Sequence, residues 1–412
     1  MRRSIAGIAA LGLTLSLAAC GGNNSNTGSQ GSTAPTAADG GGQKITVWVD
    51  ETRIGPVKAA AEKFEADTGA KVETVTKNFD DIRADFNSQV PTGKGPDITV
   101  GAHDWLGELI KNGVVAPTEL GDKAGEFSEV AVQAFTYDGK VYGVPYAVEN
   151  IGLIRNTELA PTAPATFDEM VSMGKEAGTK YPFLIQVDAN GDPYTMTPFQ
   201  NSFGATVFKQ NSDGSYTSEL NLGGEPGHAF ANWLKAHGKT GTNVLSTSMT
   251  YDIAVEQFKQ GNAPFIVGGP WMLDQFKDLK LAVDLIPTPG PETAAPFVGV
   301  QGFYVNAKSP NALLANQFLL NYIGSEDIQV KMFEAGNRTP ALKAAAEKVN
   351  SDPIVAGFAK VAEKAVPMPS IPEMGEVWNF LGVTEAQIIN GEVDPVAGWD
   401  KMVADIEAAI AK

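Results

Sequence analysis

The chain has 412 residues, 43% of them hydrophobic, which is long enough for more than one folded lobe. Its formal net charge at pH 7 is -17, with 48 acidic against 31 basic side chains, and this balance argues against nucleic acid or an anionic membrane surface as its partner. Since the 3 histidines are scattered and there is 1 cysteine, the sequence predicts no metal site.

The first 19 residues have the pattern of an export signal. Arg2 and Arg3 precede an apolar run over residues 5–19 that is too short for an anchoring membrane span. The run ends in Leu-Ala-Ala-Cys at positions 17–20, which resembles the lipobox of bacterial lipoproteins. An ordinary signal peptide with a chance cysteine is the alternative, but Cys20 has no second cysteine to pair with in this chain. We therefore expect residues 1–19 to be a lipoprotein signal peptide and Cys20 to carry the lipid.

Residues 20–43 predict a flexible tether. They are nearly all Gly, Asn, Ser, Thr, Gln, Ala and Pro, a composition that cannot bury enough apolar surface to fold. A diacyl anchor on Cys20 would supply the two lipid chains that stable membrane attachment requires. The expected location is the extracellular face of the cell membrane, in an envelope of the Gram-positive type, and a lipoprotein of a Gram-negative envelope is the alternative.

The folded part begins with alternating strand and helix patterns. Strands are expected over 44–50, 71–75 and 97–100, with helices over 57–67 and 81–90 between them. The first helix is stopped by Gly69. This alternation favours a parallel sheet flanked by helices.

The alternation continues further along the chain. Strand-like runs occur at 183–187, 263–267 and 281–285, with a helix pattern over 252–260. No tandem repeat is visible, so two similar lobes are favoured over a solenoid. In open α/β sheets ligands bind beyond the carboxyl ends of the strands, so the loops there are the first candidates for a site.

No catalytic or cofactor-binding motif is present. The sequence lacks a nucleophile elbow, an HExxH motif, a phosphate loop and a dinucleotide fingerprint, so it predicts neither a catalytic centre nor a cofactor. Loop positions do carry aromatic residues: Trp105, Tyr194, Trp271 and Trp378. A pyranose has apolar faces that stack on aromatic rings and hydroxyls that bind carboxylates or guanidinium groups. Taken singly, however, each Trp reads more simply as a core residue and each acid as a surface charge.

Short motifs follow one another in a fixed order from Lys44 to Lys412. They are Phe-Glu-Ala-Asp-Thr-Gly at 64–69, Gly-Pro-Asp-Ile at 95–98, Ala-His-Asp at 102–104, Pro-Tyr-Ala-Val-Glu at 145–149, Gly-Pro-Trp at 269–271, Pro-Phe-Val-Gly-Val at 296–300, Asn-Ala-Lys-Ser-Pro-Asn at 306–311 and Met-Pro-Ser-Ile-Pro at 368–372. In type and spacing they resemble the maltose- and maltodextrin-binding family of extracellular solute-binding proteins of ABC importers, the family 1 carbohydrate binders, in lipoprotein form.

The resemblance implies a hinged, two-lobed α/β fold, the type II periplasmic-binding-protein fold, in which each lobe is a mainly parallel sheet flanked by helices. Crossovers between the lobes are expected near 147–151, near 296–301 and around Ser351. The expected N-lobe is 44–148 plus 298–350, and the expected C-lobe is 149–297 plus 351–412.

The resemblance also implies a set of sugar-binding residues. They are Glu51, Arg53, Asp104, Trp105, Glu149, Asp192, Tyr194, Tyr251, Trp271 and Trp378. Gly101 stands where the Gram-negative maltose protein has a stacking Trp, and Trp105 where it has an Arg, so one platform is expected to have moved by four positions. The loop at 50–53 looks more like that of Gram-positive and thermophile binders of maltodextrin or cyclodextrin.

By resemblance, the chain is a monomeric binding protein, not an enzyme, that captures a malto-oligosaccharide and delivers it to an ABC permease in the membrane. Ligand would populate the closed form by binding it better than the open form. The same fold could instead carry a cyclodextrin, trehalose, another glycan, a polyamine or a metal chelate. A rival from another class is a secreted glycosidase that uses Asp104 and Glu149 as its carboxylate pair.

Overall fold

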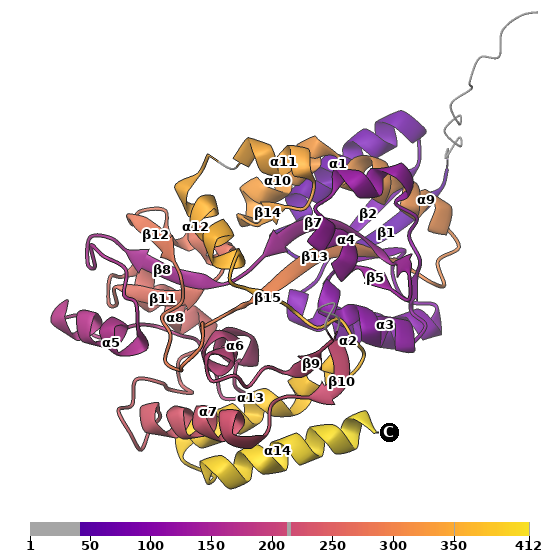
Figure 1. The fold of residues 1–412 in the computed structure, drawn as a ribbon. Coiled ribbons are helices and arrows are strands. Elements are labelled where there is room, and N and C mark those ends of the chain that lie inside the picture. Colours follow the sequence, from indigo (N-terminus) through magenta and orange to yellow (C-terminus); the bar gives the residue numbers. More distant parts are fainter. Residues whose placement is uncertain (1–41, 212–215, 350, 412) are drawn as a thin grey trace, which may run out of the picture. The chain divides into compact units, whose positions relative to one another are not determined.

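The computed structural model describes residues 42–211, 216–349 and 351–411, which are coloured in Figure 1. The predicted signal peptide, Cys20 and all but the last two residues of the tether lie outside these ranges. Within the ranges, no helix is both long enough and apolar enough to cross a membrane.

The chain begins with the predicted alternation of strands and helices. The elements are β1 (Lys44–Val49), α1 (Ile54–Thr68), β2 (Lys71–Thr76), α2 (Phe79–Gln89) and β3 (Ile98–Ala102). Gly69 ends α1 in the left-handed conformation, with φ at 73°, which glycine adopts without steric cost. The three predicted strands and both predicted helices of this segment are confirmed.

An eight-stranded mixed sheet forms the centre of the first lobe. Its main path runs β14-β7-β13-β3-β1-β2, and β4 and β15 also pair with β13. The added strands are β4 (Val115–Ala116), β7 (Gly143–Glu149), β13 (Phe297–Asn306), β14 (Thr339–Pro340) and β15 (Val366–Pro367). β1 is parallel to β2 and β3, whereas β13 is antiparallel to β3, β4 and β7, and β14 is antiparallel to β7. This sheet is therefore mixed, which differs from the mainly parallel arrangement expected for the lobe. Strand β13 thus brings a late part of the chain into the middle of this sheet.

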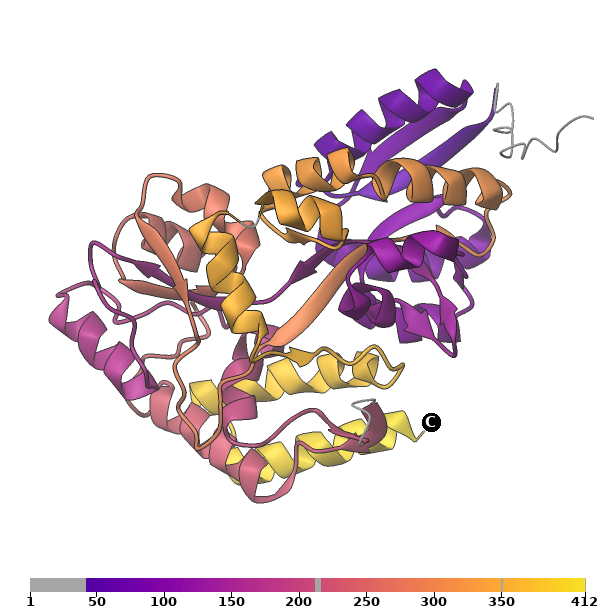
Figure 2. The same cartoon turned by 45° about the horizontal axis from the view of Figure 1, so that its top comes forward.

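Helices lie along both faces of the large sheet (Figures 1 and 2). On the side of α1 are α9 (Ala312–Phe318), α10 (Glu326–Gly336) and α11 (Lys343–Val349), and on the side of α2 is α3 (Leu106–Lys111). The shorter elements are α4 (Glu129–Ala134), the hairpin of β5 (Thr136–Tyr137) and β6 (Lys140–Val141), the 3-10 turns η1 (Val90–Thr92), η2 (His103–Trp105) and η3 (Gly121–Glu126), and the π-helical turn η5 (Leu319–Ile323).

The second lobe is built on a three-stranded sheet of order β11-β8-β12. Its strands are β8 (Gly152–Asn156), β11 (Phe265–Gly268) and β12 (Leu281–Asp284). β8 is antiparallel to both neighbours, which differs from the mainly parallel arrangement expected for this lobe. The run 183–187 also differs from expectation, because it forms only the single parallel bridge Leu184–Ile266. Beyond that bridge the N–H of Val187 bonds to the carbonyl of Met249, which draws the chain away from β11.

Helices make up most of the second lobe. They are α5 (Phe167–Glu176), α6 (Pro193–Ser202), α7 (Gly224–His237), α8 (Tyr251–Lys259), α12 (Pro353–Ala362), α13 (Met374–Asn390) and α14 (Pro395–Ile410). The remaining elements are the 3-10 helix η4 (Pro270–Phe276) and the antiparallel pair β9 (Phe208–Gln210) and β10 (Tyr216–Leu220). Helices α13 and α14 lie side by side and both contact α7 (Figure 2). The predicted helix over 252–260 is confirmed as α8.

Buried hydrophobic side chains form separate cores. One core takes its buried members from 45–147 and 300–345. A second core takes its buried members from 151–297 and 368–406. A smaller third core, with different members, takes them from positions between 154 and 361. Each of the first two cores therefore combines early and late parts of the chain, and the site lies between them. The exact lobe boundaries given above stay a prediction.

Candidate ligand-binding cleft

A cavity of about 610 Å³ lies between the two lobes. Its walls on the large-sheet side are Asn78, Phe79, Asp80, Ala102, Asp104, Glu149, Gln301 and Arg338, and on the other side they are Gln186, Gly191, Asp192, Pro193, Tyr194, Tyr251, Trp271, Met368 and Trp378. The first wall lies at the carboxyl ends of β2, β3 and β7, where binding was expected for an α/β sheet.

Most of the predicted sugar-binding residues come together here. Those that line the cavity are Asp104, Glu149, Asp192, Tyr194, Tyr251, Trp271 and Trp378. Glu51, Arg53 and Trp105 do not line it: Glu51 is exposed, and the other two are buried behind the first wall. Their direct contact with a ligand stays a prediction.

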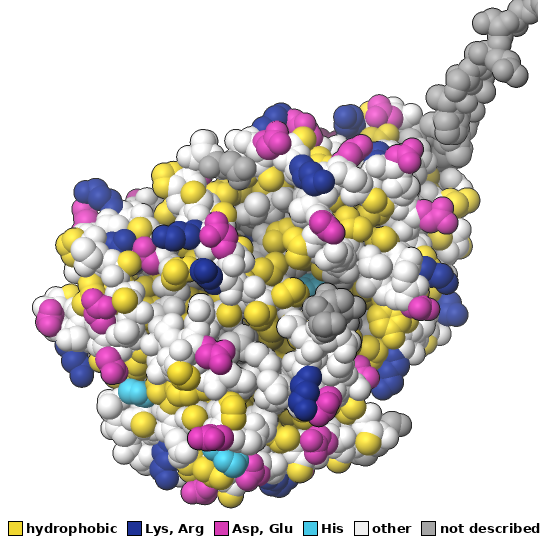
Figure 3. Space-filling view, viewed as in Figure 1, with side chains coloured by type: hydrophobic (Ala, Val, Ile, Leu, Met, Phe, Trp, Pro, Cys, Tyr) yellow, Lys and Arg dark blue, Asp and Glu magenta, His cyan; other side chains and the backbone are white. Residues whose placement is uncertain are grey.

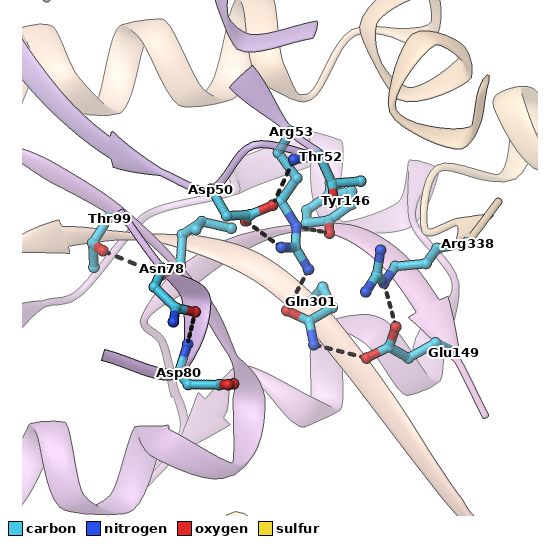
Figure 4. Close-up of polar contacts among 11 residues, drawn as sticks. Asp50, Thr52, Arg53, Asn78, Asp80, Thr99, Tyr146, Glu149, Gln301 and Arg338 are labelled. Atoms are coloured by element: carbon cyan, nitrogen blue, oxygen red, sulfur yellow. Dashed lines mark hydrogen bonds and ion pairs between the residues drawn. The ribbon is translucent and has the colours of Figure 1, made fainter. Parts of the chain in front are cut away.

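Arg53 is held from three sides. Its Nη1 pairs with Asp50, its Nε donates to the Tyr146 hydroxyl, and its Nη2 donates to Gln301 Oε1 at 3.3 Å (Figure 4). Burial disfavours the guanidinium charge, but Tyr146 and Asp50 outweigh it and raise the pKa of Arg53. Only 4% of Arg53 is exposed, so this cation lies buried behind the first wall and supports it.

The same network continues to the cavity surface. Gln301 on β13 donates through Nε2 to Glu149 Oε1 at 2.7 Å, and the other Glu149 oxygen pairs with Arg338 Nε (Figure 4). Two acids, Asp50 and Glu149, thus balance two cations, Arg53 and Arg338. Buried charges persist when they are paired and hydrogen-bonded in this way. Both oxygens of Glu149 are fixed before any ligand arrives.

The second wall is organised by Asp192, the N-cap of α6. Its Oδ1 accepts the Thr195 N–H at 3.0 Å, and its Oδ2 accepts from the Thr195 hydroxyl at 2.8 Å and from the Gln186 amide. Burial raises the pKa of Asp192. Two polar atoms beside it, Gln186 Oε1 and the Tyr194 hydroxyl, are buried and have no hydrogen-bond partner among the described residues. Such atoms normally have a partner, which a bound molecule could supply.

Aromatic rings form most of the rest of the second wall. The rings of Tyr194 and Trp271 are 6.4 Å apart between centroids, and the Arg338 guanidinium lies 5.4 Å from the Trp271 ring centre. The indole N–H of Trp378 donates across the cavity to Asp104 at 3.3 Å. Burial raises the pKa of Asp104. Arg338 and Trp378 therefore both connect the two walls.

Several wall residues were missed by sequence reasoning. They are Asn78, Phe79, Asp80, Gln186, Gln301, Arg338 and Met368. The rule that ligands bind beyond strand ends could have found Asn78 to Asp80, which directly follow β2. No local pattern indicates Gln301 or Arg338, because each is placed by a contact with a residue more than 100 positions away.

The fold and the cleft define a two-lobed ligand-binding protein. Among residues 42–211, 216–349 and 351–411, no group of three or more His, Cys, Asp or Glu side chains could hold a metal ion. On the face shown in Figure 3, acidic and basic side chains are interspersed and form no extended basic patch. The cleft instead offers rings, carboxylates and amides, which suit a neutral polar molecule with apolar faces.

The chain belongs to the family of bacterial extracellular solute-binding proteins, whose sequence pattern matches residues 59–357. Members of this family are transport components and not enzymes. The chain is 29% identical to the maltodextrin-binding protein MdxE of Bacillus subtilis, over 92% of this chain and 90% of that protein. It is 26% identical to the galactooligosaccharide-binding protein of the same species, over 94% and 93% of the two chains.

Two further similarities bear on the fold and on the cell-surface context. The chain is 27% identical to a maltooligosaccharide ABC transporter solute-binding lipoprotein of Streptococcus pneumoniae, over 92% of both chains. The solved structure of the Thermus thermophilus maltotriose-binding protein with maltotriose superposes with a TM-score of 0.81 at 32% identity, over 89% of this chain and 100% of that one. The family resemblance and the two-lobed fold predicted from the motifs are therefore confirmed.

Proposed function

We propose that this chain is a lipid-anchored, extracellular binding protein that captures a malto-oligosaccharide and delivers it to an ABC permease in the membrane. The observation that carries this proposal is the wall of Tyr194, Tyr251, Trp271 and Trp378 facing Asp104 and Glu149 across one cavity. Aromatic rings stack on the apolar faces of glucose units, and the carboxylates accept hydrogen bonds from the hydroxyls.

The unpartnered polar atoms support a ligand rich in hydroxyl groups. The Tyr194 hydroxyl can donate and Gln186 Oε1 can accept, and the hydroxyl groups of a sugar can serve as partners of both kinds. Hydroxyl groups of a bound sugar would supply the missing partners of these atoms and offset the cost of burying them.

The groups that would bind the ligand are divided between the two walls, and this division explains why the lobes would close on it. The fixed carboxylate of Glu149 and the side chain of Asp104 stand on one wall, and the rings of Trp271 and Trp378 stand on the other. A ligand bound to both walls stabilises the closed arrangement over the open one. The permease partner then receives a closed, loaded protein that acts as a monomer.

The choice of an α-glucan rests on the relatives named above, and a galacto-oligosaccharide is the second candidate, because one relative of similar identity is named for it. Isothermal titration of the full chain with maltose, maltotriose, α-cyclodextrin, trehalose and a galacto-oligosaccharide distinguishes the two candidates. A lipid-anchored chain has to be kept in solution with detergent. This detergent must lack a sugar headgroup, since a maltoside would compete with the test sugars for the cleft.

We expect saturable binding of maltotriose that is lost in Trp271→Ala and kept in Trp233→Phe. Trp233 is the matched control because it packs against Phe167 and Phe199 in the second lobe and does not line the cavity. Binding of the galacto-oligosaccharide alone would transfer the proposal to that sugar. A folded protein that binds none of the five sugars would exclude sugar capture by this cleft.

The lipid anchor is tested on Cys20, which lies outside the described residues. In a Gram-positive host the full chain should fractionate with membranes, and intact-mass measurement should show a diacylglyceryl group on a chain that starts at Cys20. Cys20→Ala should release the protein into the medium with unchanged affinity for sugar. Equal membrane association of both proteins would contradict lipidation at this cysteine.

A further inference from the structure

Position 101, on the cleft end of β3, has no space for a side chain. A Cβ atom on Gly101 would lie 2.6 Å from Trp105 Cε3 and 2.9 Å from Tyr304 Cε2. The Trp105 ring occupies that space and is itself 8% exposed, and it is absent from the cavity wall. Neither position therefore presents an aromatic face to the cleft on the large-sheet side.

Phe79 provides an aromatic ring on that side. It is the first residue of α2, directly beyond the loop that follows β2, and its half-buried side chain lines the cavity. Among the described residues, Phe79 is the only aromatic one in the large-sheet wall of this cavity. The residues on either side, Asn78 and Asp80, also line the cavity and are exposed.

Buried groups fix the Phe79 ring from behind. The Trp105 ring lies 5.1 Å from it between centroids, at 34° between the planes. The Arg53 guanidinium lies 4.7 Å from the Phe79 ring centre. Arg53 is itself held by Asp50, Tyr146 and Gln301, so the ring rests on a support that has few alternative positions. A ring held in place loses little entropy when a ligand stacks on it.

We propose that Phe79 is the stacking residue of the large-sheet wall, on which one sugar ring packs while Tyr194, Trp271 and Trp378 contact the ligand from the other lobe. The proposal rests on the proposed function, because it assigns a further contact in the same cleft. It makes Arg53 and Trp105 positioning residues that act on the ligand through the Phe79 ring.

The test compares Phe79→Leu and Phe79→Tyr by titration of the full chain with maltotriose. Leucine keeps apolar bulk and folding but has no flat face, so we expect affinity to fall about tenfold or more, which corresponds to about 1.4 kcal/mol. Tyrosine keeps the ring, and its affinity should stay within about threefold of the unaltered protein. Phe203→Leu is the matched control, since Phe203 is also half-buried but packs on Phe230 and Trp233 away from the cavity.

A double-mutant cycle tests the positioning role of Arg53. If Arg53 acts partly through Phe79, Arg53→Lys should weaken binding by a larger factor in the unaltered chain than in the Phe79→Leu background. Equal factors in both backgrounds would overturn this role. Unchanged affinity in Phe79→Leu, with normal binding by the unaltered chain, would overturn the stacking role and leave the proposed function standing. Failure of the unaltered chain to bind any sugar would overturn both.

Discussion

Trp378 of α13 donates its indole N–H to a carboxylate oxygen of Asp104 at 3.3 Å, although 274 positions separate the two residues. The donor belongs to the second lobe and the acceptor follows β3 of the first. This hydrogen bond spans the cleft, and the Trp378 ring lines the same cavity. One side chain thus offers a stacking surface and a contact between the lobes.

Trp378→Phe separates these two roles, because phenylalanine keeps a ring and lacks the N–H group. We expect sugar affinity to fall by about 0.5 to 1.5 kcal/mol, the usual contribution of one hydrogen bond, and Trp378→Ala to lose clearly more. Titration calorimetry measures both. Trp399→Phe is the matched control: it also removes an indole N–H, which donates to the Leu222 carbonyl at 2.7 Å, but it lies away from the cleft. Equal affinities of the two Phe variants would contradict the inter-lobe role.

Arg338→Met should destabilise the protein. The Glu149–Arg338 pair is largely buried, with side-chain exposures of 8% and 12%, so removal of the cation leaves an unpaired buried carboxylate. We expect the free energy of unfolding to fall by roughly 2 to 4 kcal/mol, measured by urea denaturation.

Two further variants check this interpretation. Lys331→Met breaks the exposed pair with Asp327 and should cost less than about 0.5 kcal/mol. The double variant Arg338→Met with Glu149→Gln should recover most of the lost stability, because neither position of this pair then carries a buried charge. A cost for Arg338→Met as small as that for Lys331→Met would show that the pair does not stabilise the fold.

Tyr194→Phe should change affinity and stability in opposite directions. The hydroxyl is buried without a partner among the described residues, so its removal should leave the ligand-free protein as stable or slightly more stable. Maltotriose affinity should fall by about 1 kcal/mol, because a sugar hydroxyl loses its partner. Tyr304→Phe should show the reverse pattern, since its hydroxyl donates to the Ala102 carbonyl at 2.8 Å. Lower stability of Tyr194→Phe without ligand would count against the assignment.

Glu385 on α13 should make stability depend on pH. Both its oxygens are buried without a hydrogen-bond partner in the described structure, and burial, with a smaller contribution from Asp192, raises its pKa well above 4.5. The folded state therefore keeps this proton to a higher pH than the unfolded state. Stability contributed by the proton is fully present below about pH 4.5 and is lost as pH rises towards the folded pKa.

Glu385→Gln removes that titration. Thermal unfolding between pH 5 and 8 should show the variant gaining on the unaltered protein as pH rises, with the largest difference at pH 8. Glu363→Gln, at an exposed position, is the control and should run parallel to the unaltered protein. Parallel curves for Glu385→Gln as well would mean that the Glu385 carboxyl is not kept protonated by the fold.

Much of the candidate site was within reach of the sequence. The motifs at 102–104, 145–149 and 269–271 indicated Asp104, Glu149 and Trp271, and the structure places all three on one cavity. Strand direction in the second lobe was not within reach, because the apolar runs of β8, β11 and β12 look the same in a parallel or an antiparallel sheet. Nor was the burial of the Trp105 ring behind the cavity wall, which depends on its contacts with Gly101 and Phe79.

The sequence by itself determined the first three strands and first two helices of the first lobe, the family and the candidate acids and rings, because these depend on local periodicity and on motifs of a few residues. Only the tertiary structure decided which buried contacts hold the candidate acids and rings in place. Arg53 meets Tyr146 and Gln301 across 93 and 248 positions, and Arg338 meets Glu149 across 189. Such contacts leave no local pattern, since a buried charge requires a partner in space and not at any fixed spacing along the chain.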